Sequence, residues 1–218
     1  MGGISAIVLG VAYIVIIPLY VYAGASPSGG EAWLRYAAGK TRVWWIILGL
    51  SVLTDFLFVP VALSLYFALK GVNRDAMLIA TSFVGLFIVL DLAVTWPNFA
   101  SLIILSGNYA AATTDAQRAA YVAAADYASA VLTSTLEGVY SILVLSLGIL
   151  MVGVVMLKSI IFSKTTAYLG LGTGILGIIS VAGPFVLSTL GVAVIIASVL
   201  TTVWVLFVGF RLYRLSLR

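Results

Sequence analysis

Six long apolar runs dominate the pattern of hydrophobic and polar positions along the chain. A helix that crosses a bilayer needs about 20 apolar residues, and each run has roughly that length. Polar breaks separate the runs, and none shows the alternation of apolar and polar residues that indicates a strand. We therefore predict an all-α fold, a polytopic transmembrane helical bundle that forms a single domain over residues 1–218. Its spans are expected at about 4–24, 43–69, 76–96, 135–157, 166–187 and 190–210.

Two connecting segments are longer than simple turns. Residues 25–42 contain EAWLRYAAGKTR, for which we expect a short helix lying at the membrane interface. Residues 98–134 contain an alanine-rich run behind Thr114 and Gln117, which have the spacing of a capping box. We therefore expect an extra-membrane helical segment before span four. It starts near Asp115 and either continues straight into that span or joins it at a kink.

Composition agrees with a membrane protein and removes several kinds of chemistry. Of the 218 residues, 63% are hydrophobic and 8% are charged, whereas soluble domains carry roughly 25% charged residues. The chain has no Cys and no His, which excludes disulfides, thiol catalysis, and His- or Cys-based zinc and haem ligation. It also lacks the GxSxG and SxxK motifs of activated serines. We therefore expect no cofactor and no metal site.

The Lys and Arg residues predict the orientation of the bundle. With six spans, both termini share one side of the membrane. That side carries seven basic residues against four on the other, which predicts that both termini are cytoplasmic in the cell membrane. The seven are Lys70, Arg74, Lys158, Lys164, Arg211, Arg214 and Arg218, and the four are Arg35, Lys40, Arg42 and Arg118.

These basic residues also indicate the partners. Most of them flank apolar runs, where they suit lipid headgroups rather than nucleic acid. We therefore expect membrane lipids as partners and no nucleic acid. A homo-oligomer or other membrane subunits stay open as further partners.

Three acids fall within the predicted spans. Asp55 lies twelve residues into the second span, roughly 18 Å deep, and Asp91 lies fifteen residues into the third, roughly 22 Å along. Glu137 falls near the outer boundary of the fourth. A lipid-exposed carboxylate costs about 3 kcal/mol or more, so these groups are expected to face the bundle interior. We infer a polar cavity open to the outer face. Its candidate ligand-binding residues are Asp55, Asp91, Glu137, Tyr140, Asn98 and Arg118.

A purely structural role for the same acids stays open. A neutral Asp55 would donate a hydrogen bond to a neighbouring helix and brace the bundle, and Glu137 would reach the headgroup region. We expect Asp55 to be neutral, because the basic residues on its side of the membrane lie at loop depth. Gly170 and Gly174, four residues apart, favour close helix packing inside the bundle over a dimer interface.

Three stretches carry a family resemblance: LTDFLFVPVALSLYFALKGVNRDA, NYAAATTDAQRAAYVAAADY and MLKSIIFSKTTAYLGLGTGILG. From about residue 43 on, the chain is similar to a broad family of six-span bacterial and archaeal integral membrane proteins of unknown function. The resemblance implies six helices and no known activity, and it assigns no catalytic residue. The residues that carry it are Tyr109, Arg118, Lys158, Ser159, Phe162 and Gly170.

Three functions remain open at this stage. The first is a non-enzymatic membrane protein whose outward polar cavity binds a lipid or small molecule, or an accessory subunit of a membrane complex. The alternative is a small proton- or cation-linked transporter or channel that uses Asp55. The absence of an internal repeat and of buried charge in the cytoplasmic half argues against it. The second alternative is a carboxylate-based membrane enzyme, against which the missing nucleophile motifs argue.

Overall fold

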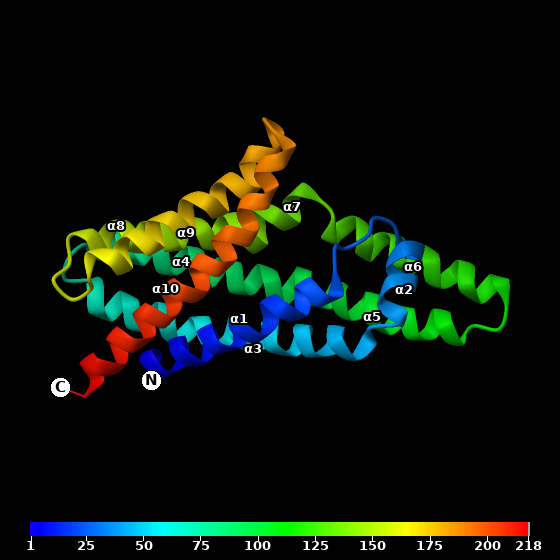
Figure 1. The fold of residues 1–218 in the computed structure, drawn as a ribbon, viewed down its shortest axis with the longest axis horizontal. Coiled ribbons are helices and arrows are strands. Elements are labelled where there is room, and N and C mark those ends of the chain that lie inside the picture. Colours follow the sequence, from blue (N-terminus) through cyan, green and yellow to red (C-terminus); the bar gives the residue numbers. More distant parts are fainter. Residues whose placement is uncertain (218) are drawn as a thin grey trace.

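The fold is a bundle of six long helical segments, each long and apolar enough to cross a membrane. The computed structural model describes residues 1–217, which contain no strand, so the predicted all-α bundle with six spans is confirmed (Figure 1). Arg218, one of the basic residues counted above, lies outside the described residues. The spans are α1 (Gly2–Ala23), α3 (Thr41–Leu69), α4 with η1 and α5 (Arg74–Ala111), α7 with η2 and α8 (Thr135–Leu157), α9 with η3 (Lys164–Phe185), and η4 with α10 (Ser188–Ser216).

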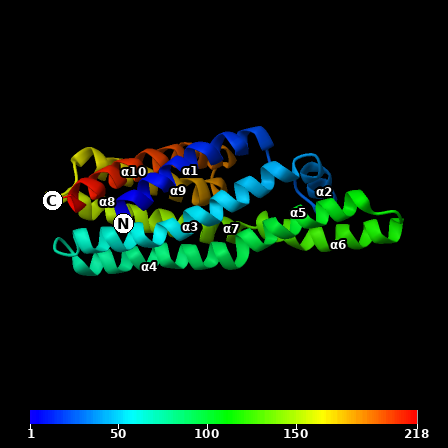
Figure 2. The same cartoon turned by 90° about the horizontal axis from the view of Figure 1, so that it is seen from below.

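The six spans form a closed ring. Each packs against two neighbours, in the order α1, α3, α4, α8, α9 and α10, and α10 returns to α1. Both termini lie at one end of the bundle, here called the terminal end, and the opposite end is called the cap end (Figures 1 and 2). A large apolar core fills the ring toward the terminal end. Its buried side chains include Phe58, Leu65, Met77, Met156 and Trp204.

A second core holds the cap end together. Helices α5 (Trp96–Ala111) and α6 (Asp115–Leu132) form a long antiparallel hairpin that extends past the other spans (Figure 2). Helix α2 (Gly30–Ala38) packs against both of them, and Trp33 and Leu34 are buried there. The Ser106 hydroxyl donates to the Leu34 carbonyl over 2.8 Å. A short helix is thus present within residues 25–42, as expected, and its apolar face is covered by protein.

The third span is longer than the predicted 76–96. Its helix passes through a π-helical turn, η1 (Asp91–Thr95), and continues to Ala111. Pro97 stands in the first turn of α5, directly after the π turn that joins α5 to α4. Such turns are one of the ways a helix accommodates a local irregularity. For this reason Pro97 does not end the helix, contrary to the sequence-based boundary.

The helix expected near Asp115 is confirmed in its position and its cap. Helix α6 begins at Asp115, and the Thr114 hydroxyl accepts a hydrogen bond from the Gln117 amide over 3.2 Å. The chain then breaks at Thr133 before α7 (Thr135–Gly138) begins. The projecting helix therefore joins the fourth span at a break, the second of the two expected arrangements.

The glycines of α9 (Lys164–Ala182) allow close packing within the ring. A Cβ at Gly174 would lie 2.8 Å from the Ser146 carbonyl oxygen of the neighbouring span, and one at Gly170 would lie 2.8 Å from Trp204 Nε1. Both positions therefore face helices of the same chain. This placement agrees with internal packing, which the spacing favoured.

Candidate functional site

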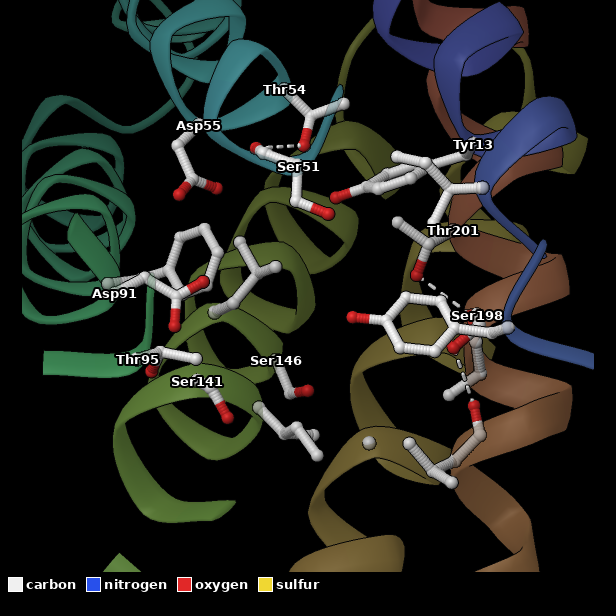
Figure 3. Close-up of a pocket in the computed structure, with 18 of the residues that line it drawn as sticks. Tyr13, Ser51, Thr54, Asp55, Asp91, Thr95, Ser141, Ser146, Ser198 and Thr201 are labelled. Atoms are coloured by element: carbon white, nitrogen blue, oxygen red, sulfur yellow. Dashed lines mark hydrogen bonds between the residues drawn. The ribbon is translucent and has the colours of Figure 1, made fainter. Parts of the chain in front are cut away.

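A cavity of about 330 Å³ lies inside the ring, and residues from all six spans line it (Figure 3). Its volume is at the lower end of the range of small-molecule sites. It lies between the two cores. Phe87 and Ile149 of the apolar core line it on one side, and Phe99, which packs against the core of the cap, lines it on the other. The polar residues of the wall are Tyr13, Tyr20, Ser51, Thr54, Asp55, Asp91, Thr95, Trp96, Glu137, Ser141, Ser146, Thr173, Ser198 and Thr201.

Three acids from three helices meet at this cavity. Asp55 on α3 and Asp91 at the start of η1 are 2% and 3% exposed, and Glu137 on α7 is partly buried. Each acid has a hydroxyl residue four positions away that also lines the cavity, which places the pair on one helical face. These pairs are Ser51 with Asp55, Asp91 with Thr95, and Glu137 with Ser141.

Asp55 has a specific partner across the cavity wall. The Trp96 indole Nε1 donates a hydrogen bond to Asp55 Oδ2 over 2.6 Å. The Trp96 ring also lies at the cavity and contacts Phe99, with the ring centroids 5.8 Å apart. Phe99 in turn stacks on the buried Trp44 of α3. Asp55 is therefore the acceptor in this bond, and it connects the cavity to the aromatic core of the cap.

Several polar atoms in the wall have no hydrogen-bond partner. Asp91 Oδ1, Thr95 Oγ1 and Thr173 Oγ1 are buried and unpaired among residues 1–217. Figure 3 shows the Asp91 and Thr95 side chains on the same side of the cavity, opposite Tyr13 and Thr201. Buried polar groups in proteins almost always have a partner. Unpaired atoms around a cavity are therefore what a binding site for a polar group would present.

Two π-helical turns flank the acids. In η1 the Trp96 amide bonds to the Asp91 carbonyl, and in η2 (Val139–Leu143) the Val144 amide bonds to the Val139 carbonyl. The two turns contact each other across the α4–α8 boundary. Such turns appear mostly as single insertions in helices and frequently at functional sites. Their position beside Asp91 and Glu137 supports this cavity as the site.

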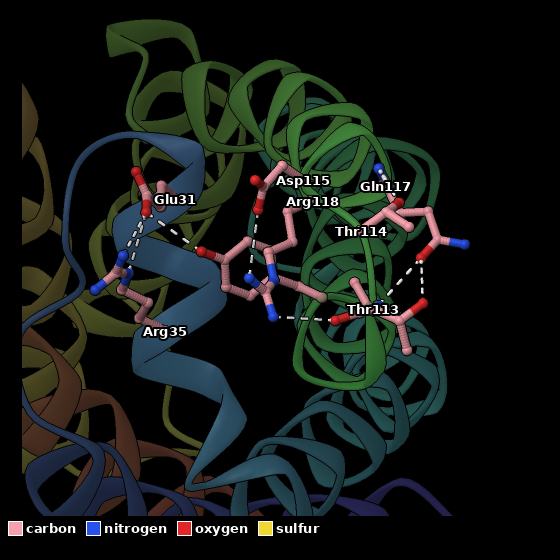
Figure 4. A network of polar contacts seen from close by, with 9 residues as sticks. Glu31, Arg35, Thr113, Thr114, Asp115, Gln117 and Arg118 are labelled. Carbon is pink, nitrogen blue, oxygen red and sulfur yellow. Dashed lines mark hydrogen bonds and ion pairs between the residues drawn. The ribbon is translucent and has the colours of Figure 1, made fainter.

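Three of the six candidate residues lie elsewhere. Tyr140 is partly buried in η2 and does not line the cavity. The Asn98 side chain donates to the Val94 carbonyl over 2.8 Å, within its own helix. Arg118 lies at the end of the α5–α6 hairpin, where it contacts Asp115 at 3.6 Å and donates to the Ala112 carbonyl (Figure 4). The structure thus brings together Asp55, Asp91 and Glu137, and not Tyr140, Asn98 or Arg118.

The other ion pair of the cap end is also separate from the cavity. Arg35 Nη2 contacts Glu31 Oε1 at 2.6 Å on the exposed side of α2, and Tyr109 donates to the same oxygen (Figure 4). The hydrogen bond from Arg35 lowers the pKa of Glu31 below its ordinary value of 4.5. The ion pairs in residues 1–217 therefore involve none of the three cavity acids.

Several wall residues were not anticipated from the sequence. Tyr13 and Tyr20 on α1, Thr173 on α9, and Ser198 and Thr201 on α10 all line the cavity. A helical spacing rule would have found some of them, since Tyr13 and Tyr20 are seven residues apart and Ser198 and Thr201 are three apart. Among residues 1–217, no group of three acids is arranged to hold a metal ion.

Comparison with known proteins gives one match. A family model described as a domain of unknown function, DUF4386, matches residues 4–213, nearly the whole chain. No curated protein and no solved structure matches the chain.

Proposed function

Because the chain belongs to the DUF4386 family, a family of unknown function, we propose its function from the cavity: it is a membrane protein that binds a small amphipathic molecule inside its helix ring. The observation that carries the proposal is the cavity of about 330 Å³, walled by all six spans and lined by unpaired buried polar atoms. Its walls combine aromatic rings with polar side chains that converge on one space, which suits an amphipathic ligand.

The position of the cavity supports entry from the cap end. The apolar core with Phe58 and Trp204 closes the ring toward the terminal end, and a small apolar space of about 20 Å³ lies within it. A transporter or channel needs a polar path through both halves of the membrane. The filled terminal half favours binding over transport. With the termini in the cytoplasm, as the basic residues indicate, the cavity would face the outer side of the cell membrane.

Ser198 of α10 offers a way to block the cavity without touching the acids. It lines the cavity and is the wall residue with an exposed side chain, so it marks the rim among residues 1–217. Ser198→Phe should obstruct the cavity, whereas Val199→Phe, one position along on the same helix and 47% exposed, should leave it open.

The test uses purified protein in detergent and three small probes with one shared body: phenethylammonium, phenethyl alcohol and phenylacetate. A ligand that binds only the folded state raises its unfolding temperature in a saturable manner. We expect at least one probe to do so with wild type and Val199→Phe, and not with Ser198→Phe. If no probe binds saturably, or if Ser198→Phe binds as wild type does, the proposal is wrong.

A further inference from the structure

We infer that the ligand of this cavity is an organic ammonium ion, that is, a protonated or quaternary amine on a small apolar body. The inference rests on the proposed function and names its ligand class. It combines the charge of the cavity wall, an unpaired buried carboxylate oxygen, and the aromatic rings around both.

The wall has acidic side chains and, among residues 1–217, no basic side chain. The acidic side chains are those of Asp55, Asp91 and Glu137. Two cations of the cap end are engaged elsewhere: Arg35 with Glu31, and Lys40 with the Ala23 carbonyl at 2.6 Å. Charges interact strongly where water is scarce. A cationic ligand therefore gains from this wall, while an anionic ligand would be buried against acids.

The unpaired atoms indicate that the ligand donates hydrogen bonds or carries a positive charge. Asp91 is 3% exposed, and its Oδ1 has no partner in the described chain. Asp55 accepts a hydrogen bond from Trp96 of another span, whereas no side-chain hydrogen bond found in residues 1–217 joins Asp91 to another span. Figure 3 shows both carboxylates on the same side of the cavity, with Thr95 beside Asp91. An ammonium group between them would supply the missing interactions.

The aromatic rings distinguish an organic cation from a metal ion. A hard metal ion needs several oxygens converging on one point, and the three acids do not form such a group. The wall also contains five aromatic rings, whose faces attract ammonium groups. These rings belong to Tyr13, Tyr20, Phe87, Trp96 and Phe99.

The same wall argues against a phospholipid headgroup as the source of the amine. An ethanolamine or choline headgroup carries a phosphate next to its ammonium group. No basic side chain of residues 1–217 lines the cavity to pair with that phosphate. Leaving a buried anion unpaired is costly. The ligand is therefore an amine without a phosphate.

The experiment extends the three-probe titration to selectivity. We expect phenethylammonium to bind wild type at least about tenfold more tightly than phenethyl alcohol, as a desolvated cation between carboxylates and aromatic rings should. Phenylacetate should not bind. Asp91→Asn should remove most of the preference for the ammonium probe. Asp75→Asn, an exposed acid in the first turn of the same span, should retain it.

The outcomes separate this inference from the proposed function. If the alcohol and the ammonium probe bind equally and Ser198→Phe blocks both, the cavity binds ligands but the inference is wrong. If no probe binds, both fail. Should Asp91→Asn not fold, the selectivity of wild type alone decides. In a last arm, lysophosphatidylethanolamine is added as competitor. If this lipid displaces phenethylammonium less well than free ethanolamine does, the result supports an amine without a phosphate. If it displaces the probe better, the exclusion of a phospholipid headgroup is wrong.

Discussion

At the scale of single residues, the contact between Trp96 and Asp55 organises the site. A buried acid on α3 receives an indole N–H from the start of α5, so two spans are joined by one side-chain bond. Such a hydrogen bond adds little net stability, but a buried polar group that loses its partner lowers the free energy of unfolding by about 1–3 kcal/mol. Asp91, by contrast, is buried without this kind of bond to its Oδ1 atom. The two acids therefore differ in their hydrogen bonding: Asp55 is tied to another span, and Asp91 Oδ1 is unpaired among residues 1–217.

The Trp96 bond leads to a prediction on stability. Trp96→Phe should lower the free energy of unfolding by about 1–3 kcal/mol, because Asp55 loses its donor. Asp55→Asn should cost less, since Asn keeps an acceptor for the indole. SDS-induced unfolding of both single variants and the double variant would give their coupling energy, expected at about 0.5–3 kcal/mol.

Trp45→Phe provides the matched control for this cycle. Trp45 is 43% exposed on the same bundle and makes no side-chain hydrogen bond among those found in residues 1–217. A loss in Trp96→Phe no larger than in Trp45→Phe, together with no coupling to Asp55, would show that the bond does not stabilise the fold.

At the scale of helices, closure of the ring depends on small residues. Helix α9 lies between α8 and α10, and it approaches both through glycines. Without large driving forces between apolar helices in lipid, such close backbone contact is a main source of stability. The positions of the glycines around α9 therefore decide how tightly the ring closes around the cavity.

Two glycines of α9 give a matched pair of substitutions. A Cβ at Gly174 would lie 2.6 Å from Leu150 Cβ and 2.8 Å from the Ser146 carbonyl oxygen, whereas at Gly172 the nearest atom would be 3.6 Å away. Gly174→Ala should therefore destabilise the protein by about 1–3 kcal/mol through overpacking. Gly172→Ala should be neutral or stabilise it by up to about 1 kcal/mol, since Ala favours helix. Thermal unfolding of both variants checks this, and equal effects would contradict it.

At the scale of the whole molecule, the two ends differ. The terminal end is a filled apolar core, and the cap end consists of α2 packed on the α5–α6 hairpin above a polar cavity. Asp126 of α6 accepts a hydrogen bond from the Gly30 amide over 2.7 Å, at the N-terminus of α2, where a negative charge is favourable. The cap is therefore fastened to the hairpin by polar contacts as well as by its core.

The orientation of this asymmetric molecule can be measured with cysteines, since the chain has none. Ala116 is exposed on the projecting hairpin, and Ile160 is 98% exposed in the turn before α9. If both termini are cytoplasmic, as the basic residues predict, a membrane-impermeant maleimide should label Ala116→Cys in intact cells. Ile160→Cys should react only after the membrane is opened. Labelling of both cysteines from one side would show that the hairpin and the turn before α9 do not lie on opposite sides of the membrane. The reversed pattern would show that the termini lie outside.

The features that the sequence alone determined are local. The six spans follow from the apolar run lengths, because a backbone in lipid must satisfy its own hydrogen bonds within each helix. The start of α6 at Asp115 follows from Thr114 and Gln117, which act on their own turn. Placing Asp55, Asp91 and Glu137 toward the bundle interior required only the cost of a carboxylate in lipid. None of these conclusions depends on how one helix rotates against another.

The tertiary structure decided everything that depends on helix rotation and on contacts between distant segments. Trp96 reaches Asp55 across 41 positions of the chain, and Tyr13 and Thr201 meet at one cavity only because the ring closes. Arg118 stays at the hairpin tip because α5 continues past Pro97, a length that the proline concealed. Side-chain packing between helices is set by their combined surfaces, which no single stretch encodes. For that reason the sequence identified the acids, and the ring determined that they line one cavity.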